Sequence, residues 1–100
     1  MTLTSQQRKH LRGLAHPLAP VVHLGRAGVT DSVVAAIEVA LAAHELIKVR
    51  MHSPEDKHAM AADMAARCNA EVCGVLGHTV ILYRRHSEDP RIELPRKGPA

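Results

Sequence analysis

Aromatic residues are nearly absent from this 100-residue chain, which contains no Phe, no Trp and a single Tyr, Tyr83. The hydrophobic 46% of the residues therefore consists of aliphatic and other small side chains, enough for one compact core and too few for two. This scarcity excludes a platform of several exposed rings on which single-stranded bases stack. We expect Tyr83 itself to pack in a strand with its hydroxyl group hydrogen-bonded.

Cysteine and long apolar runs are also scarce. Cys68 and Cys73 do not have the C-x-x-C spacing of metal and redox sites. We expect two buried free thiols, and a disulfide or a reactive pair is the alternative. No run approaches the roughly 20 apolar residues of a spanning helix, and the N-terminus has no signal-peptide apolar region. These absences predict a cytoplasmic protein without a membrane partner.

Patterns typical of metal sites and catalysis are missing as well. The eight histidines show no H-E-x-x-H or short H-x-H spacing, so we expect no metal and no cofactor. His16, next to Pro17, is interpreted as a buried or capping residue. We see no nucleophile-base arrangement and expect no enzymatic activity. The enzymatic alternative is an RNA-cleaving activity that uses His16 or His23 with Lys48.

Charge is distributed unevenly along the chain, whose formal net charge is +3. Residues 1–30 contain four basic residues and no acidic residue, whereas the remaining 70 contain nine basic and ten acidic residues. The four are Arg8, Lys9, Arg12 and Arg26. Because a surface that serves only solubility usually mixes both signs, this segment favours a binding surface for an anionic partner over a plain solvated face.

The first elements are a helix and a short strand. Thr4 and Gln7 form a capping-box pattern that predicts a helix over residues 5–14. Prolines at positions 17 and 20 end it, because proline cannot donate a backbone hydrogen bond. Residues 21–24 are β-prone and predict a brief strand that ends at Gly25.

A second helix and strand follow. Thr30 is a suitable N-cap for a helix with so few charges that we expect it to be covered on most sides. Residues 46–51 alternate with period two, which predicts a strand with Lys48 and Arg50 on its outer face. We expect the apolar residues of this helix and strand to be buried together, namely Ile37, Leu41, Ile47 and Val49.

The last elements are a helix and a hairpin. Ser53-Pro54 followed by Asp56 predicts a helix start with the serine as N-cap, and Asn69 is a plausible C-cap. Residues 72–76 and 79–84 are β-prone runs separated by the turn pair Gly77-His78.

The element order is therefore α-β-α-β-α-β-β. It predicts the α+β class, an α/β sandwich in which helices pack on a mixed sheet. We expect one domain over residues 1–86 and a solvated tail over residues 87–100.

The segment Gly25-Arg26-Ala27-Gly28 lies between a predicted strand end and a predicted helix start. The glycines permit a tight turn, and backbone N–H groups at the helix N-terminus can bind an anion. Arg26 adds a planar donor group suited to phosphate oxygens. Its G-x-x-G pattern by itself is weak evidence and favours an ordinary strand-to-helix turn. It fits neither the Walker loop nor the dinucleotide fingerprint.

The whole pattern resembles the YhbY family of bacterial CRM-domain proteins, whose name stands for chloroplast RNA splicing and ribosome maturation. The resemblance covers residues 3–96, and its most specific block is His44-Glu45-Leu46-Ile47-Lys48-Val49. The other matching segments are Leu14-Ala15-His16, the strand after the prolines, the Gly25 to Gly28 loop with Thr30, and Ile92-Glu93-Leu94-Pro95-Arg96.

The resemblance implies a single domain of three helices and a four-stranded mixed sheet, similar to the C-terminal domain of translation initiation factor 3. It also implies RNA binding, for bacterial members to ribosomal RNA in precursors of the large ribosomal subunit, by a protein that we expect to be a monomer. The family's binding loop maps onto Gly25, Arg26, Ala27 and Gly28. The implied basic surface consists of Arg8, Lys9, Arg12, Lys48 and Arg50. The alternative is a protein-interaction module that docks on a ribosomal or assembly protein through an apolar face, and an exposed aliphatic patch along residues 33–43 would favour it.

Overall fold

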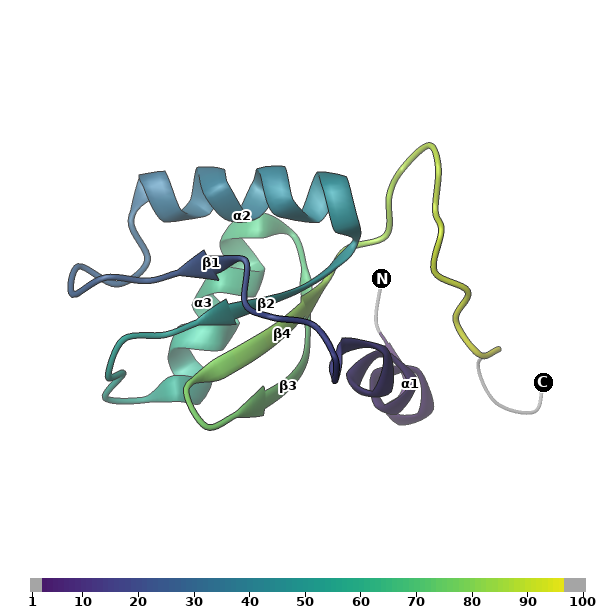
Figure 1. Cartoon of the computed structure of the whole chain (residues 1–100), viewed down its shortest axis with the longest axis horizontal. Helices are drawn as coiled ribbons and strands as arrows, with labels where there is room; N and C mark the ends of the chain where they lie inside the picture. Colours follow the sequence, from purple (N-terminus) through teal and green to yellow (C-terminus); the bar gives the residue numbers. More distant parts are fainter. Residues whose placement is uncertain (1–2, 97–100) are drawn as a thin grey trace.

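The computed structural model describes residues 3–96 and contains three helices and four strands in the predicted order (Figure 1). The sheet order is β1-β2-β4-β3, with β1 parallel to β2 and the other pairs antiparallel. The predicted α+β class and mixed sheet are therefore confirmed. The elements are α1 (Ser5–Ala15), β1 (Val22–His23), α2 (Asp31–His44), β2 (Leu46–Arg50), α3 (Lys57–Cys68), β3 (Glu71–Leu76) and β4 (Thr79–Tyr83).

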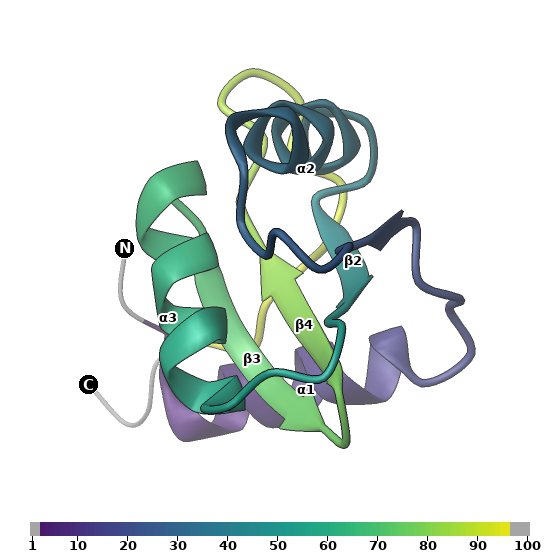
Figure 2. The ribbon, with the colours of Figure 1, turned by 90° about the vertical axis from the view of Figure 1, so that its left-hand side faces the viewer.

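Helices α2 and α3 cover one face of the sheet, and α1 crosses the opposite face (Figure 2). The main core lies between the sheet and the α2-α3 pair. Ile37 and Leu41 from α2 are buried there with Ile47 and Val49 from β2, as predicted. The expectation that α2 is covered on most sides is wrong, because Val39 on its outer surface is 72% exposed. The helix carries alanines rather than charges on that surface, so its low charge did not indicate burial.

A second, smaller core lies beneath α1. Leu11 and Ala15 of α1 pack against Leu46, Ile81 and Tyr83 of the sheet. The C-terminal segment also contributes, because Ile92 and Leu94 pack against this cluster.

The described residues after 86 are mostly exposed, as expected of a solvated tail, but the segment is also tied to the domain, which the sequence did not indicate. Glu45, which is 3% exposed, holds the segment in place. Its carboxylate accepts hydrogen bonds from the backbone N–H groups of His86 (2.8 Å), Arg91 (2.7 Å) and Ile92 (3.0 Å).

Local capping signals explain where the helices begin and end. The Thr4 and Gln7 capping box and the Thr30 N-cap are both present. The predicted start of α3 at Ser53 is wrong: Asp56 is the N-cap, and its carboxylate accepts a hydrogen bond from Ala59 N–H. Ser53 instead lies in a turn with φ 38°. Asn69 ends α3 in the left-handed conformation, as predicted.

Candidate nucleic-acid interface

The Gly25 to Gly28 segment is a tight turn at one end of the sheet. The backbone N–H of Gly28 donates to the carbonyl oxygen of Gly25 at 3.1 Å, and Gly28 has φ 72°, where glycine is favoured. Arg26 and Ala27 at the tip are exposed, and their backbone N–H groups make no backbone hydrogen bond to any described residue. The turn therefore presents two N–H groups and one guanidinium group to solvent.

The start of α2 contributes less to anion binding than the sequence suggested. The Gly28 N–H points back into the turn, and the Thr30 hydroxyl accepts the hydrogen bond of Val33 N–H. Asp31 places a carboxylate in the first turn of α2, where it competes with an anion for the helix dipole. The tip of the turn, rather than the helix N-terminus, is the part suited to phosphate.

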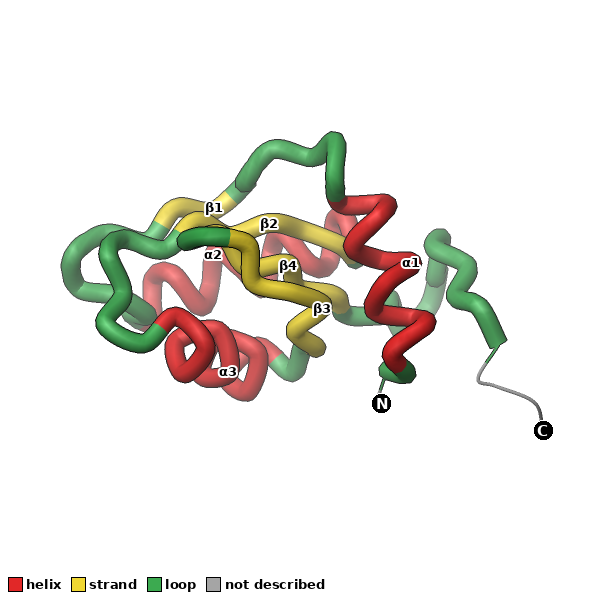
Figure 3. Tube along the Cα trace, turned by 90° about the horizontal axis from the view of Figure 1, so that it is seen from below, coloured by secondary structure: helices red, strands yellow, loops and turns green. Residues whose placement is uncertain are grey.

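Beside the turn lies an open row of the sheet. The register places His23 opposite Arg50, Arg50 opposite Thr79, and Thr79 opposite Leu76 across all four strands. This row, called here the open row, faces the α1 side, because alternate β2 residues such as Leu46 pack beneath α1. Figure 3 shows α1 crossing one end of this face and leaving the other end of the strands uncovered. Arg50 is therefore exposed on a sheet face that no helix covers at that point.

The turn and the open row are connected directly. The backbone N–H of Leu24, next to the turn, donates to the carbonyl oxygen of Arg50 at 2.8 Å. The hairpin turn reaches the same end of the sheet, since Met51 N–H donates to the His78 carbonyl oxygen at 2.7 Å. Arg26 and Arg50, 24 positions apart in the sequence, are thus carried by neighbouring segments.

Arg12 lies on the β3 side of α1. Arg12 extends over Gly74, where an added Cβ would lie only 2.8 Å from the Arg12 Cδ, and donates to the Cys73 carbonyl oxygen at 2.9 Å. That oxygen belongs to an irregularity in β3, where the register shifts between Val72 and Gly74. Arg12 therefore has a structural role that the sequence did not indicate, and its other guanidinium donors make no hydrogen bond within residues 3–96.

Arg8, Lys9 and Lys48 occupy different positions. Arg8 donates to the Leu3 carbonyl oxygen at 2.9 Å. Lys9 is exposed, and its place in the helical repeat puts it opposite the buried stripe of α1, away from the sheet. Lys48 faces α1 and clamps the segment that follows it, donating to the carbonyl oxygens of His16 (3.2 Å) and Leu18 (2.9 Å). The structure thus brings Arg12, Lys48 and Arg50 to one sheet face and leaves Lys9 apart.

None of the predicted basic residues forms an ion pair within the described residues. The salt bridges there join Arg67 to Asp63, Arg84 to Glu38 and Arg91 to Asp89. The unpaired set comprises Arg8, Lys9, Arg12, Arg26, Lys48 and Arg50. The sequence did not indicate that His23 and Thr79 lie beside Arg50 on the open row, because strand register brings them there and register cannot be read from composition.

The thiols and the histidines form no metal-binding cluster among the described residues. Cys68 and Cys73 are free and buried, as predicted. Burial raises the pKa of the Cys73 thiol to about 12, although Arg12 lowers it, so this thiol stays protonated and unreactive. No cluster of three potential metal ligands occurs within the described residues. His16 is the C-cap residue of α1, where its backbone N–H donates to the Gly13 carbonyl oxygen at 3.3 Å. Its side chain is exposed, so of the two interpretations, buried or capping, the buried one is wrong and the cap is made by the backbone.

Tyr83 is buried as expected, at 1% exposure, but its hydroxyl group has no hydrogen-bond partner among the described residues. The expected hydrogen bond is therefore absent from the structure. Burial raises the pKa of this hydroxyl, which keeps it neutral. None of the helices in residues 3–96 has the length and apolar character needed to cross a membrane.

Comparison with known proteins shows the family of the chain. The model of the CRS1/YhbY (CRM) domain family matches residues 3–84. The chain belongs to this family. It is 44% identical over 98 residues to a Haemophilus influenzae protein named "RNA-binding protein", covering 96% of this chain and 98% of the relative. It is 37% identical over 95 residues to the Bacillus subtilis "Probable RNA-binding protein YqeI", covering 93% of this chain and 99% of the relative.

A solved structure has the same fold as this chain. The solution structure of a hypothetical Staphylococcus aureus protein matches with a TM-score of 0.83 at 32% identity, covering 94% of this chain and 100% of the other. The family resemblance expected from the sequence is thereby confirmed.

Proposed function

We propose that this protein binds structured RNA, without catalysis, through the Gly25 to Gly28 turn and the basic residues on the α1 face of the sheet. The observation that carries the proposal is the unpaired state of these cations. Arg12 of α1, Arg26 of the turn, and Lys48 and Arg50 of β2 come from three separate segments, and none meets a carboxylate in the described residues. Elsewhere in residues 3–96, several arginines are neutralised by an acid. Family membership and the names of the relatives support the same function.

In this proposal, most contacts between the protein and RNA are to backbone phosphates rather than to bases. Arg26 and the N–H groups at the tip of the turn bind one phosphate, and Arg50 binds a second on the open row. Bidentate guanidinium contacts suit phosphate oxygens, and small Ala27 lets the backbone of the turn approach. The described surface exposes no Phe, Trp or Tyr ring for base stacking, so we expect shape and charge to dominate over base reading, as in the recognition of duplex RNA.

The cellular target that we propose is ribosomal RNA in precursors of the large ribosomal subunit, where the protein acts as a monomeric assembly factor in the cytoplasm. This target follows from the family resemblance, because ribosome maturation is the role associated with its bacterial members. The basic surface is compatible with it, since ribosomal RNA precursors offer many duplex segments with regularly spaced phosphates.

A titration against three labelled nucleic acids tests the proposal. The probes are hairpins of large-subunit ribosomal RNA, hairpins of small-subunit ribosomal RNA, and a DNA duplex of the same length. We expect the tightest binding to a large-subunit hairpin, with a log-log salt slope of about −3 to −4 if about four phosphates are neutralised. Equal affinity for all three would reject the ribosomal target, and binding that does not change with salt would reject the electrostatic account.

A further inference from the structure

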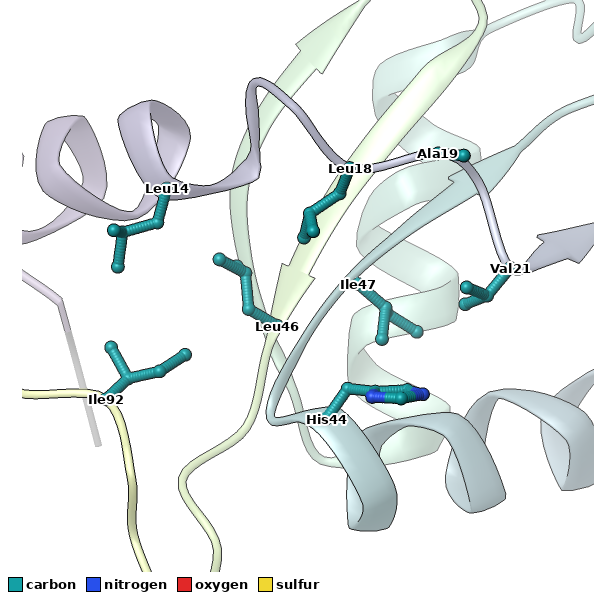
Figure 4. A pocket seen from close by; sticks show the side chains of 8 residues that line it. All are labelled: Leu14, Leu18, Ala19, Val21, His44, Leu46, Ile47 and Ile92. Carbon is teal, nitrogen blue, oxygen red and sulfur yellow. The ribbon is translucent and has the colours of Figure 1, made fainter.

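An apolar pocket of about 510 Å³ lies away from the open row, where the end of α1, the segment after it and the end of α2 meet. Figure 4 shows Leu14 and Leu18 on one side of this space, Ile92 and His44 on the other, and Leu46 and Ile47 between them. Its volume falls in the range of pockets that hold ligands or the side chains of a partner.

Exposed aliphatic residues are concentrated around this pocket. Leu14 (43%), Leu18 (40%) and Val21 (52%) line it, and they are three of the five large hydrophobic residues that are exposed in the described chain. Single exposed aliphatic residues are common on soluble proteins, but a cluster around a hollow indicates an interaction site. Burying these side chains against a partner would recover the free energy that their exposure costs.

The pocket is open because β1 is short. Its register with β2 covers only Val49 and Arg50, and the Val21 N–H extends the contact to the Lys48 carbonyl oxygen. The first residues of β2, Leu46 and Ile47, lie beyond the end of β1 and line the pocket. An incoming segment can therefore lie alongside the start of β2 with its side chains in the pocket.

The chemistry of the lining favours an apolar side chain over an RNA base. His44 is the only polar side chain among the lining residues, and no hydroxyl or carboxylate faces the space. An unstacked base has several donors and acceptors on its edges, which would lose their hydrogen bonds to water in such a pocket. An aliphatic or aromatic side chain has none to lose.

The ammonium group of Lys48, next to the pocket, indicates which residue type would lie beside the apolar side chain of a partner. Lys48 is not a lining residue, but its Nζ donates to the carbonyl oxygen of the lining residue Leu18 at 2.9 Å and to that of His16 at 3.2 Å. An ammonium group has three donors, so one remains for a carboxylate. We propose that this pocket is the docking site of a partner protein, and that it takes an apolar anchor side chain flanked by an acidic residue.

A peptide selection tests the proposal without knowledge of the natural partner. The probe is a phage-displayed library of random 12-residue peptides, selected on the whole protein. We expect the enriched peptides to share an aliphatic or aromatic residue next to Asp or Glu. Their affinity should fall by about tenfold or more in Leu18→Asn and in Val21→Asn, because each change removes apolar contact area.

The matched control is Val39→Asn, which makes the same neutral change at an exposed residue of α2 outside the pocket. It should bind the enriched peptides like the parent protein. Thermal unfolding of all three variants verifies that they are folded, and having two pocket variants keeps the test decisive if one of them is not.

Three results would overturn the proposal. The first is that no peptide is enriched, or that the enriched peptides bind the pocket variants unchanged. The second is a loss of RNA affinity in Leu18→Asn and Val21→Asn but not in Val39→Asn, which would make the pocket a base-binding site. The third is a dimer of the parent protein that Leu18→Asn dissociates, which would make the occupant a second copy. RNA affinity is measured separately, so failure here leaves the proposed RNA binding intact.

Discussion

The two faces of the sheet differ in what covers them and in how their charges are used. On the α2-α3 face, the helices bury a continuous aliphatic core, and Arg84 at its edge is neutralised by Glu38. On the α1 face, a single helix covers only one end, and Arg12, Lys48 and Arg50 meet no carboxylate in the described chain. The α2-α3 face therefore stabilises the fold, whereas the α1 face carries unpaired basic side chains whose positions the fold determines.

Core truncation on the α2-α3 face should have the largest effect on stability. Ile37 is fully buried, so Ile37→Ala should lower the free energy of unfolding by about 2–5 kcal/mol. Chemical denaturation measures this loss. RNA affinity of the folded variant, measured well below its melting temperature, should change little. A large loss of affinity in the folded state would show that the two faces are not separable.

Removing the Glu45 charge should have the next largest effect, because its carboxylate accepts three backbone N–H groups. Glu45→Gln should cost about 1.5–3 kcal/mol of stability, the range for hydrogen bonds to a charged group. Thermal unfolding of the variant and the parent protein measures the difference.

The same carboxylate predicts how stability depends on pH. Burial raises the pKa of Glu45, but the backbone N–H groups lower it more, so in the folded protein it lies below the ordinary 4.5. The stabilisation is therefore complete above the unfolded pKa and is lost as pH falls through the folded one. Glu45→Gln should flatten the stability curve below about pH 4.5. An unchanged curve would show that the C-terminal segment is not held by this charge.

Gly28→Ala should have a smaller effect. The φ of 72° costs a residue with a Cβ about 1–2 kcal/mol, although that Cβ would meet only Met60 at an ordinary 3.8 Å. Gly25→Ala is the matched control, because its backbone is not left-handed and an added Cβ would meet nothing within 4 Å. Equal melting temperatures for the two variants would contradict the turn geometry.

Tyr83→Phe should have the smallest effect, with no loss of stability or a slight gain. The Tyr83 hydroxyl is buried without a partner, so removing it eliminates an unsatisfied polar group and leaves the packing of the ring intact. Thermal unfolding provides the measurement. A loss above about 1 kcal/mol would reveal a hydrogen bond to the hydroxyl, for example through a buried water.

The sequence predicted the elements whose signals are local. The Thr4 capping box, the Thr30 cap and the Gly77-His78 hairpin turn all act within a few residues, and the structure contains each of them. The start of α3 was misplaced because Ser53 and Asp56 are competing caps, and tertiary context selected Asp56. Such a choice between neighbouring caps is not encoded in propensity alone.

The parts that failed depend on contacts between distant segments. The anchoring of residues 86–92 requires Glu45 to be buried next to them, which no local pattern indicates. The sequence identified the basic residues of the site, but not that Arg12 and Lys48 also bind backbone carbonyl groups, nor that strand register brings His23 beside Arg50. Register follows from the packing of whole strands.

RNA affinity of charge-matched arginine variants tests the central claim most directly. Arg26→Ala and Arg50→Ala remove exposed, unpaired charges of the proposed interface, and Arg91→Ala removes another exposed charge, which is paired with Asp89. All three lower the net charge by the same amount, and titration of a labelled ribosomal RNA hairpin at a fixed salt concentration measures each affinity. We predict that each interface variant loses about 1–3 kcal/mol of binding free energy, the range for a charge-assisted hydrogen bond, and that Arg91→Ala binds nearly as the parent does. Equal losses in all three would contradict the account, because net charge rather than the turn and the open row would then govern binding.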